Sequence, residues 1–166
     1  MARLSIAQET SREALDFYSS YPALGEAASG LLLAVYSADN PLPPLVREAV
    51  RMRIALANDC IVCKSARLVA GLDEAFYAKI GDFRDYLDLY GEQVSTALEF
   101  ADLFALDHLS IDDRHFARLR ELFSEEEIAA LAISCAYFSA FGRLTRVLLL
   151  DHACPVPSTP SSFLVV

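Results

Sequence analysis

Residues 41–71 read PLPPLVREAVRMRIALANDCIVCKSARLVAG, and this stretch decides the expected fold. Its paired prolines suit the first turn of a helix, where the amide groups have no partner within the helix. Apolar residues then recur at helical spacing until Asn58 and Asp59 interrupt the pattern. The sequence therefore predicts a helix over Pro43–Ala57, followed by a second helix over Cys60–Ala70.

The two helices are expected to form an antiparallel hairpin. Either residue of the interruption can cap the second helix, and Gly71 stands where a left-handed residue ends one. Residues equidistant from the turn then face each other, which places Glu48 near the level of Arg67 to Val69. A carboxylate would lie beside the helix that carries the cysteines.

The rest of the chain has the same helical periodicity, and strand patterns are hard to find. The predicted fold class is all-α, a single domain over residues 1–166, with residues 155–166 as an extended or flexible tail. Leu24–Ser37 is apolar nearly all round and is expected to be buried. A capping box at Ser124 and Glu127 opens a long buried helix. That long helix has its apolar stretch over Ile128–Leu150, and the other predicted helices cover Ser11–Ser19, Asp73–Lys79, Asp82–Tyr90, Glu92–Leu106 and Asp112–Leu122.

Composition narrows the possible partners. Hydrophobic residues make up 54% of the 166 residues, a surplus that suggests a subunit interface and hence a homo-oligomer. Asp and Glu number 23 against 14 Lys and Arg, which argues against nucleic acid. The uncharged part of the last helix is shorter than the roughly 20 residues a bilayer span needs, so no membrane is expected. The N-terminal residues MARLSIAQET resemble no secretion signal, and we expect a cytoplasmic protein.

Cys60-Ile-Val-Cys63 is the candidate reactive site. Side chains three residues apart share a helix face, so the two sulfurs can form a disulfide. Amide groups at a helix start stabilise a thiolate, which favours Cys60 as the cysteine with the lower pKa. The alternatives are two buried apolar fillers, or zinc with His152 and Cys154 as a second pair. Because the first pair opens a helix and no second compact knuckle follows, we expect no metal and no cofactor.

Two charged residues complete the candidate site. Arg67 follows Cys63 by four residues, so on a continuous helix it could reach the Cys63 sulfur or Glu48. Glu48 is the candidate general acid or base, and its alternative reading is a helix-surface acid paired with Arg47 or Arg51. A buried ion pair between Arg67 and Glu48 would keep the carboxylate ionised and make the cluster structural.

The run from Glu48 to Cys63 resembles the signature of the carboxymuconolactone decarboxylase superfamily, in its alkylhydroperoxidase D-like branch. Glu48 lies twelve positions before Cys60, as in that motif. Residues 122–127, followed by an apolar helix and Gly142-Arg143-Leu144, are similar to the family's second block in layout. The resemblance covers residues 22–154, approximately. The family has a histidine four residues after its second cysteine, where this sequence has Arg67.

The resemblance implies an all-helical subunit that forms homodimers, trimers or hexamers and reduces peroxides. In that scheme Cys63 attacks the peroxide, Cys60 closes the disulfide, and Glu48 belongs to a proton relay. A dithiol reductant, either lipoyl or thioredoxin-like, then restores the thiols. Two other functions stay open: a decarboxylase-like lactone enzyme that uses no disulfide, and a non-catalytic helical oligomer with an ion-paired core.

Overall fold

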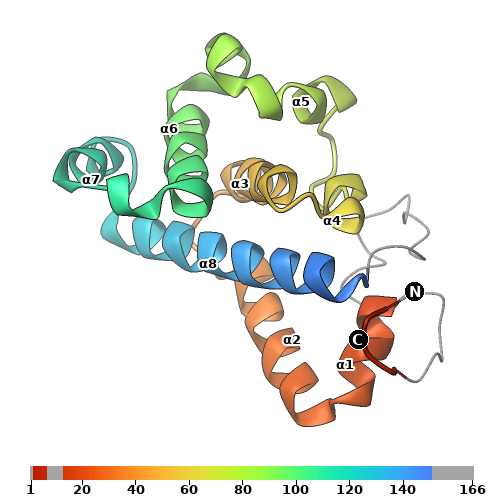
Figure 1. Cartoon of the computed structure of the whole chain (residues 1–166). Coiled ribbons are helices and arrows are strands. Elements are labelled where there is room, and N and C mark those ends of the chain that lie inside the picture. Colours follow the sequence, from red (N-terminus) through yellow and green to blue (C-terminus); the bar gives the residue numbers. More distant parts are fainter. Residues whose placement is uncertain (1, 7–12, 151–166) are drawn as a thin grey trace.

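The computed structural model describes residues 2–6 and 13–150, and every regular element in these ranges is helical (Figure 1). This confirms the predicted all-α fold class. The predicted tail, together with His152 and Cys154, lies outside the described residues. In chain order the elements are α1 (Glu13–Ser20), α2 (Pro22–Tyr36), α3 (Pro44–Ala57), α4 (Ile61–Ser65), α5 (Glu74–Ala78), η1 (Ile80–Asp85), α6 (Leu87–Leu106), η2 (His108–Ser110), α7 (Asp113–Arg120) and α8 (Glu125–Leu148).

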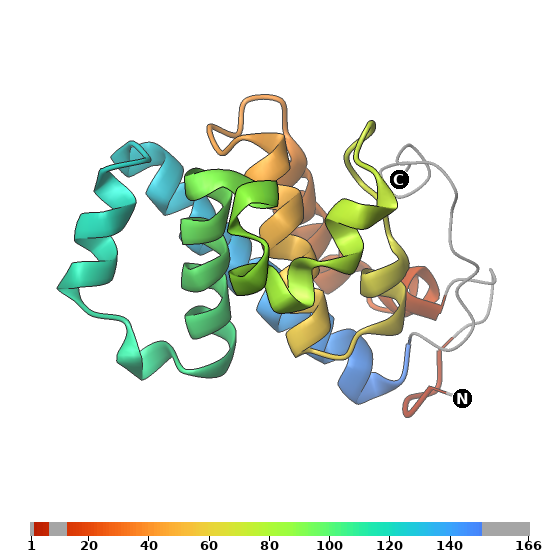
Figure 2. The same cartoon turned by 90° about the horizontal axis from the view of Figure 1, so that it is seen from above.

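Helix α3 is the centre of the fold. It packs mainly against α6 and α8, and it also contacts α4 and η1. Figure 1 shows α8 passing between α3 on one side and the α1–α2 pair on the other. In Figure 2, α7 lies at the opposite end of the molecule from α4. The arrangement buries most of α3, including Arg47, Glu48 and Arg51, so the fold surrounds the helix that carries Glu48.

Helix α8 begins at the predicted capping box, but it is buried along one face only, since Ile133 and Val147 are exposed. Ser124 accepts a hydrogen bond from the Glu127 amide, and the Glu127 side chain accepts one from the Ser124 amide. By length and composition alone this helix could cross a bilayer. Its apolar face, which includes Leu131, Cys135 and Phe138, is instead buried in the core against α3 and α6.

The expectation that the helix over Leu24–Ser37 is buried is wrong for this chain by itself. Only Gly25 and Val35 of α2 are buried, whereas Leu24 is 73% exposed and Leu33 is 49% exposed. The helix packs mainly on α1 and α8, and Arg47 of α3 contacts its C-terminal end, so it has more apolar surface than these neighbours cover. An apolar pattern shows that a helix face avoids water, but it does not show what covers that face.

The cysteine helix is shorter than predicted, because α4 ends at Ser65 and Ala66 has an extended backbone. In a longer helix the Cys63 carbonyl would accept a hydrogen bond from the amide of Arg67. The Arg51 guanidinium donates to that carbonyl instead. Gly71 has the predicted left-handed backbone, with φ of 85°, but it lies in a later turn.

The short helices that follow partly match their predicted positions. Asp73 caps α5 by accepting from the Phe76 amide. Gly91, with φ of 70°, breaks α6 at the predicted boundary before Glu92. The predicted helix over Asp82–Tyr90 is divided between the 3₁₀ helix η1 and the first turn of α6, a difference that helical periodicity cannot reveal.

A close contact between Asn58 and Gly142 joins the α3–α4 corner to α8. The Asn58 amide donates to the carbonyls of Phe138 and Ser139, and its oxygen accepts from Arg143. A Cβ atom on Gly142 would lie 2.5 Å from the Asn58 amide nitrogen. The absence of a side chain at Gly142 therefore leaves room for Asn58 to bond to the α8 backbone.

We predict that Gly142→Ala destabilises the protein by about 1–3 kcal/mol, the usual effect of overpacking a filled core. The new methyl group would displace Asn58 and break its bonds to α8. Denaturant unfolding at one fixed protein concentration measures the change.

Gly30→Ala is the matched control, because Gly30 lies inside α2 and nothing comes within 4 Å of its added Cβ. It should stabilise the protein by about 0.5–1 kcal/mol, the helix preference of alanine over glycine. Equal stability of the two variants would show that the contact between Asn58 and α8 is not tight.

Candidate functional site

Cys60 and Cys63 are joined by a disulfide at the start of α4, with Cα atoms 5.2 Å apart. Cys60 is the N-cap residue, is fully buried, and accepts a hydrogen bond from the Cys63 amide through its sulfur. Cys63 is only half-buried. The expected sulfur pair is thus present, and the two cysteines differ in their access to solvent.

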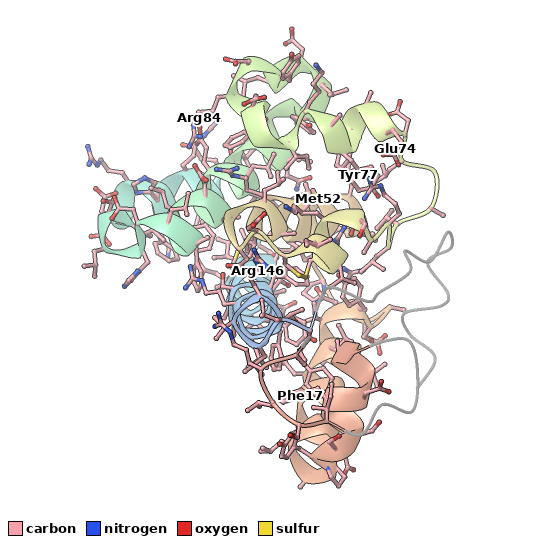
Figure 3. The ribbon with its side chains drawn as sticks, turned by 45° about the vertical axis from the view of Figure 1, so that its right-hand side comes forward. Phe17, Met52, Glu74, Tyr77, Arg84 and Arg146 are labelled. Carbon is pink, nitrogen blue, oxygen red and sulfur yellow. A yellow bond between two sulfur atoms is a disulfide. The ribbon has the colours of Figure 1, made fainter. Side chains whose placement is uncertain are left out.

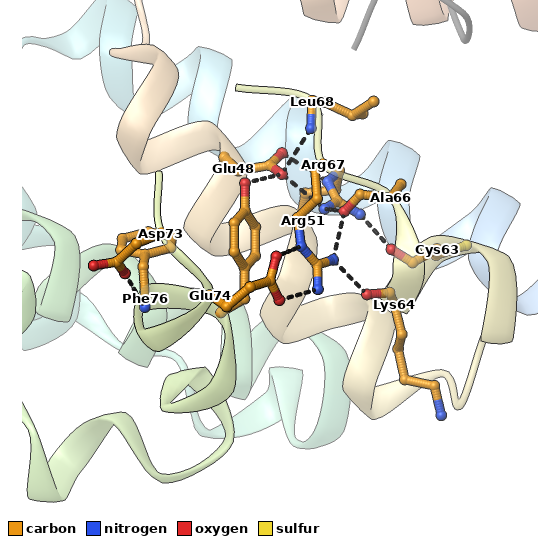
Figure 4. A network of polar contacts seen from close by, with 11 residues as sticks. Glu48, Arg51, Cys63, Lys64, Ala66, Arg67, Leu68, Asp73, Glu74 and Phe76 are labelled. Atoms are coloured by element: carbon orange, nitrogen blue, oxygen red, sulfur yellow. Dashed lines mark hydrogen bonds and ion pairs between the residues drawn. The ribbon is translucent and has the colours of Figure 1, made fainter. Parts of the chain in front are cut away.

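A buried ion pair lies next to this disulfide. Arg51 donates two hydrogen bonds to the Glu48 carboxylate, with nitrogen–oxygen distances of 2.7 and 2.8 Å. Both residues belong to α3, at most 5% of either side chain is exposed, and Figure 4 shows the network around them. Pairing with Arg51, three residues away, is the alternative reading that the sequence offered, except that the pair is buried rather than at the surface.

The same arginine holds the cysteine segment in place. Arg51 donates to the carbonyls of Cys63 and Ala66, while the Leu68 amide donates to Glu48 at 3.1 Å. This confirms that Glu48 lies at the level of residues 67–69. Both residues of the ion pair belong to α3, and both bond to the segment from Cys63 to Leu68. The pair therefore fixes the position of the disulfide relative to the core.

The surroundings of Glu48 set its protonation state. Burial would raise the pKa of the carboxyl, but the hydrogen bonds and charge of Arg51 oppose that effect. The Leu68 amide and the Tyr77 hydroxyl, 3.1 Å away, also donate to it, and together these partners hold the pKa below its usual range. An ionised carboxylate with all these donors is a poor proton acceptor.

The expected contact of Arg67 with Glu48 or the Cys63 sulfur is wrong. Arg67 pairs with Glu74 through two hydrogen bonds of 2.9 Å and lies over the ring of Tyr77, 4.1 Å from its centroid. It also donates to the Lys64 and Ala66 carbonyls. Figure 3 shows Glu74 and Tyr77 close together on α5. Since α4 ends before residue 67, the one-turn spacing from Cys63 does not apply.

An apolar cavity of about 170 Å³ adjoins the cysteines. Cys63 and Arg51 are among its lining residues, whereas Cys60 and Glu48 are not. Most of the wall is apolar or aromatic and comes from the α1–α2 pair, α3, the α4 segment and α8. A molecule in this cavity would therefore lie beside the more accessible cysteine.

In the described part of the chain, no group of three or more His, Cys, Asp or Glu side chains could hold a metal ion. The proposed second zinc pair, His152 and Cys154, lies outside the described residues. Cys135 is free but fully buried in α8, and burial raises the pKa of its thiol far above the ordinary value. It is unsuited to reaction with a solvent-borne oxidant.

Three site residues have weak signals in the sequence. The sequence indicates Arg51 only as a surface partner of Glu48, and it does not connect Tyr77 with the site. Tyr36, at the end of α2, lines the cavity from a distant part of the sequence. Spacing along one helix could indicate the first of these, but contacts between separate helices have no local pattern.

Solved structures with the same fold include alkylhydroperoxidase-like proteins. An Agrobacterium tumefaciens protein of unknown function, connected by its description to AhpD and antioxidant defence, matches 84% of this chain and 97% of its own with a TM-score of 0.72 and 22% identity. The AhpD core of a peroxidase-related protein from Ralstonia eutropha matches 83% of this chain and 75% of its own, with a TM-score of 0.71 and 19% identity. The debrominase Bmp8 matches 91% of this chain and 80% of its own, with a TM-score of 0.71 and 21% identity.

These structures confirm the AhpD-like fold that the sequence resemblance predicted. No family model matches the chain. An uncharacterized protein from two strains of Mycobacterium tuberculosis is 35% identical over 96 residues, which cover 54% of this chain. The match spans 33% of the length of those curated relatives.

We predict that Glu48→Gln lowers the free energy of unfolding at neutral pH by about 3–5 kcal/mol, because it leaves a buried guanidinium without its counter-charge. The pKa of Glu48 is lowered in the folded state, so its contribution is complete above the unfolded carboxyl pKa of about 4.3 and is lost as the pH falls through the folded value. The difference between the two proteins should therefore shrink on acidification, as denaturant unfolding at several pH values would show.

Glu74→Gln is the control for this experiment. It removes the carboxylate from the exposed pair with Arg67 and should change stability little at any pH, because solvent screens such pairs. If Glu48→Gln had an equally small effect, the buried pair would not support the site.

Proposed function

We propose that the protein is a thiol peroxidase in which Cys60 and Cys63 cycle between a dithiol and a disulfide. The observation that carries the proposal is the position of the disulfide: Cys63 is half-buried and lines an apolar cavity, in a fold shared with peroxidase-related proteins. A reversible disulfide is typical of catalytic cysteines in a reducing compartment. The proposed location is the cytoplasm.

The burial of the two sulfurs favours Cys63 as the attacking thiol. Cys60 is fully buried and does not line the cavity, so a peroxide would meet Cys63 first. The Cys63 thiolate attacks the terminal peroxide oxygen, the O–O bond breaks, and the substrate leaves as an alkoxide that takes a proton from water. Cys63 becomes a sulfenic acid.

Cys60 then resolves this intermediate. The Cys60 thiol first gives its proton to water, the resulting thiolate attacks the Cys63 sulfur, the S–O bond breaks, and the leaving hydroxide takes up that proton as water. The Cys63 amide, which donates to the Cys60 sulfur, would stabilise the Cys60 thiolate for this step. An external dithiol, lipoyl or thioredoxin-like, reduces the disulfide and is itself oxidised. A homo-oligomer is part of the proposal, since α2 has apolar surface that this chain alone leaves exposed.

In this proposal the charged residues near the disulfide hold the cysteine segment in position and do not transfer protons. Glu48 is ionised and fully engaged, so we propose that it orients Arg51 rather than carrying protons, and that Arg51 holds the Cys63 carbonyl. Arg67 secures the end of the same segment through the Lys64 and Ala66 carbonyls. The proton steps then depend on water and on the cysteines themselves.

The alternatives have less support. A decarboxylase-like lactone enzyme would need an acid or base beside its substrate, yet no carboxylate is among the described residues that line the cavity. A purely structural role for the Glu48–Arg51 pair accounts for its burial. It does not account for a disulfide next to a cavity that Cys63 lines.

A stoichiometric peroxide pulse on the reduced protein, followed by alkylation and peptide mass spectrometry, tests the proposal. We expect a Cys60–Cys63 disulfide in the wild type. Cys60→Ser should stop at a Cys63 sulfenic acid that dimedone traps, and Cys63→Ser should form neither product.

Cys135→Ala is the matched control and should react like the wild type, because its buried thiol stays protonated. If no disulfide forms, the peroxidase proposal fails. If dimedone instead labels Cys60 in Cys63→Ser, the assignment of the attacking cysteine is reversed.

A further inference from the structure

The cavity beside Cys63 has an aromatic wall. Rings from three different helices line it: Tyr18 of α1, Tyr36 of α2, and Tyr137, Phe138 and Phe141 of α8. Its volume of about 170 Å³ is close to that of engineered apolar protein cavities that bind benzene. The volume holds one aromatic ring, and the apolar lining suits such a ring better than a small polar molecule.

Tyr36 contributes a polar group that the protein itself does not use. Its hydroxyl is buried and has no hydrogen-bond partner among the described residues. The ring is held between Phe138, with centroids 6.1 Å apart, and the Arg47 guanidinium, 5.1 Å from the ring centroid. Burial raises the pKa of this phenol, so the hydroxyl stays protonated and can both donate and accept. A buried hydroxyl without a partner is unfavourable, and because Tyr36 lines the cavity, a shift of its ring toward the cavity would let a molecule there bond to the hydroxyl.

The charges around the cavity disfavour an ionised ligand. Arg51 is the only charged residue among the described residues that line it. Four hydrogen bonds to Glu48, Cys63 and Ala66 occupy four of the five N–H donors of its guanidinium. Glu48 already balances the charge of Arg51, and Arg51 has no pair of free N–H donors with which to bind a carboxylate or phosphate.

We infer that this cavity binds a neutral, single-ring aromatic molecule with one hydroxyl or hydroperoxyl group, and that the Tyr36 hydroxyl bonds to that group. The inference rests on the proposed function only in identifying the natural ligand as an aromatic hydroperoxide. Tyr36 is then the residue that selects such a molecule over a ring without the polar group.

Calorimetric titration of the oxidised protein with benzyl alcohol and with toluene tests this selection. Tyr36→Phe should weaken benzyl alcohol binding about fivefold, the effect of losing one neutral hydrogen bond, and leave toluene within about twofold. Tyr86→Phe is the matched control, because the Tyr86 hydroxyl bonds to Lys79 and Tyr86 does not line the cavity. It should leave the binding of both ligands unchanged.

Equal weakening of both ligands by Tyr36→Phe, or no binding of either ligand at millimolar concentration, would overturn the inference. Tyr36→Phe should unfold at the wild-type temperature or above it, since the lost hydroxyl had no partner in the protein. As a measurement that needs no variant, benzyl alcohol should slow iodoacetamide labelling of Cys63 in the reduced wild type. Absence of protection would count equally against the inference.

The failure of this inference and that of the proposed function are distinguishable. If benzyl alcohol binds through Tyr36 but no peroxide oxidises the cysteines, the ligand site stands and the peroxidase proposal falls. If cumene hydroperoxide and hydrogen peroxide oxidise the pair equally fast and benzyl alcohol does not bind, the peroxidase stands and the ligand site falls.

Discussion

The buried ion pair between Glu48 and Arg51 is the interaction on which the site depends. Two charges in a core are unfavourable unless their hydrogen bonds are satisfied, and here Arg51 also bonds to the Cys63 and Ala66 carbonyls while the Leu68 amide bonds to Glu48. The pair therefore does more than neutralise itself. It ends α4 early and fixes the segment after the disulfide against α3.

That constraint gives the two cysteines different environments. Cys60 begins α4 in the core, with its sulfur bonded to an amide, whereas Cys63 lines the cavity. Under the proposed function, accessibility rather than position at a helix start selects the attacking thiol. A helix of five residues has little dipole to lower one pKa below the other, so burial and a single amide bond matter more.

The sequence predicted the hairpin, its register and the cysteine pair, because capping residues, prolines and helical spacing are local signals. It did not predict that α4 stops at Ser65, since the cause is a guanidinium from another helix, and the place of Arg67 was wrong for the same reason. The sequence did not predict the exposure of α2 or the position of Tyr36 at the cavity either, because both depend on which helices meet.

The most direct test of the central claim is the second-order rate at which peroxide converts the reduced Cys60–Cys63 pair to the disulfide in folded Glu48→Gln and folded wild type. If the ion pair holds Cys63 in its reactive position, the variant should react at least about tenfold more slowly, which corresponds to about 1.4 kcal/mol in the barrier. Equal rates in the two folded proteins would contradict the account and leave the ion pair as a support of the core alone.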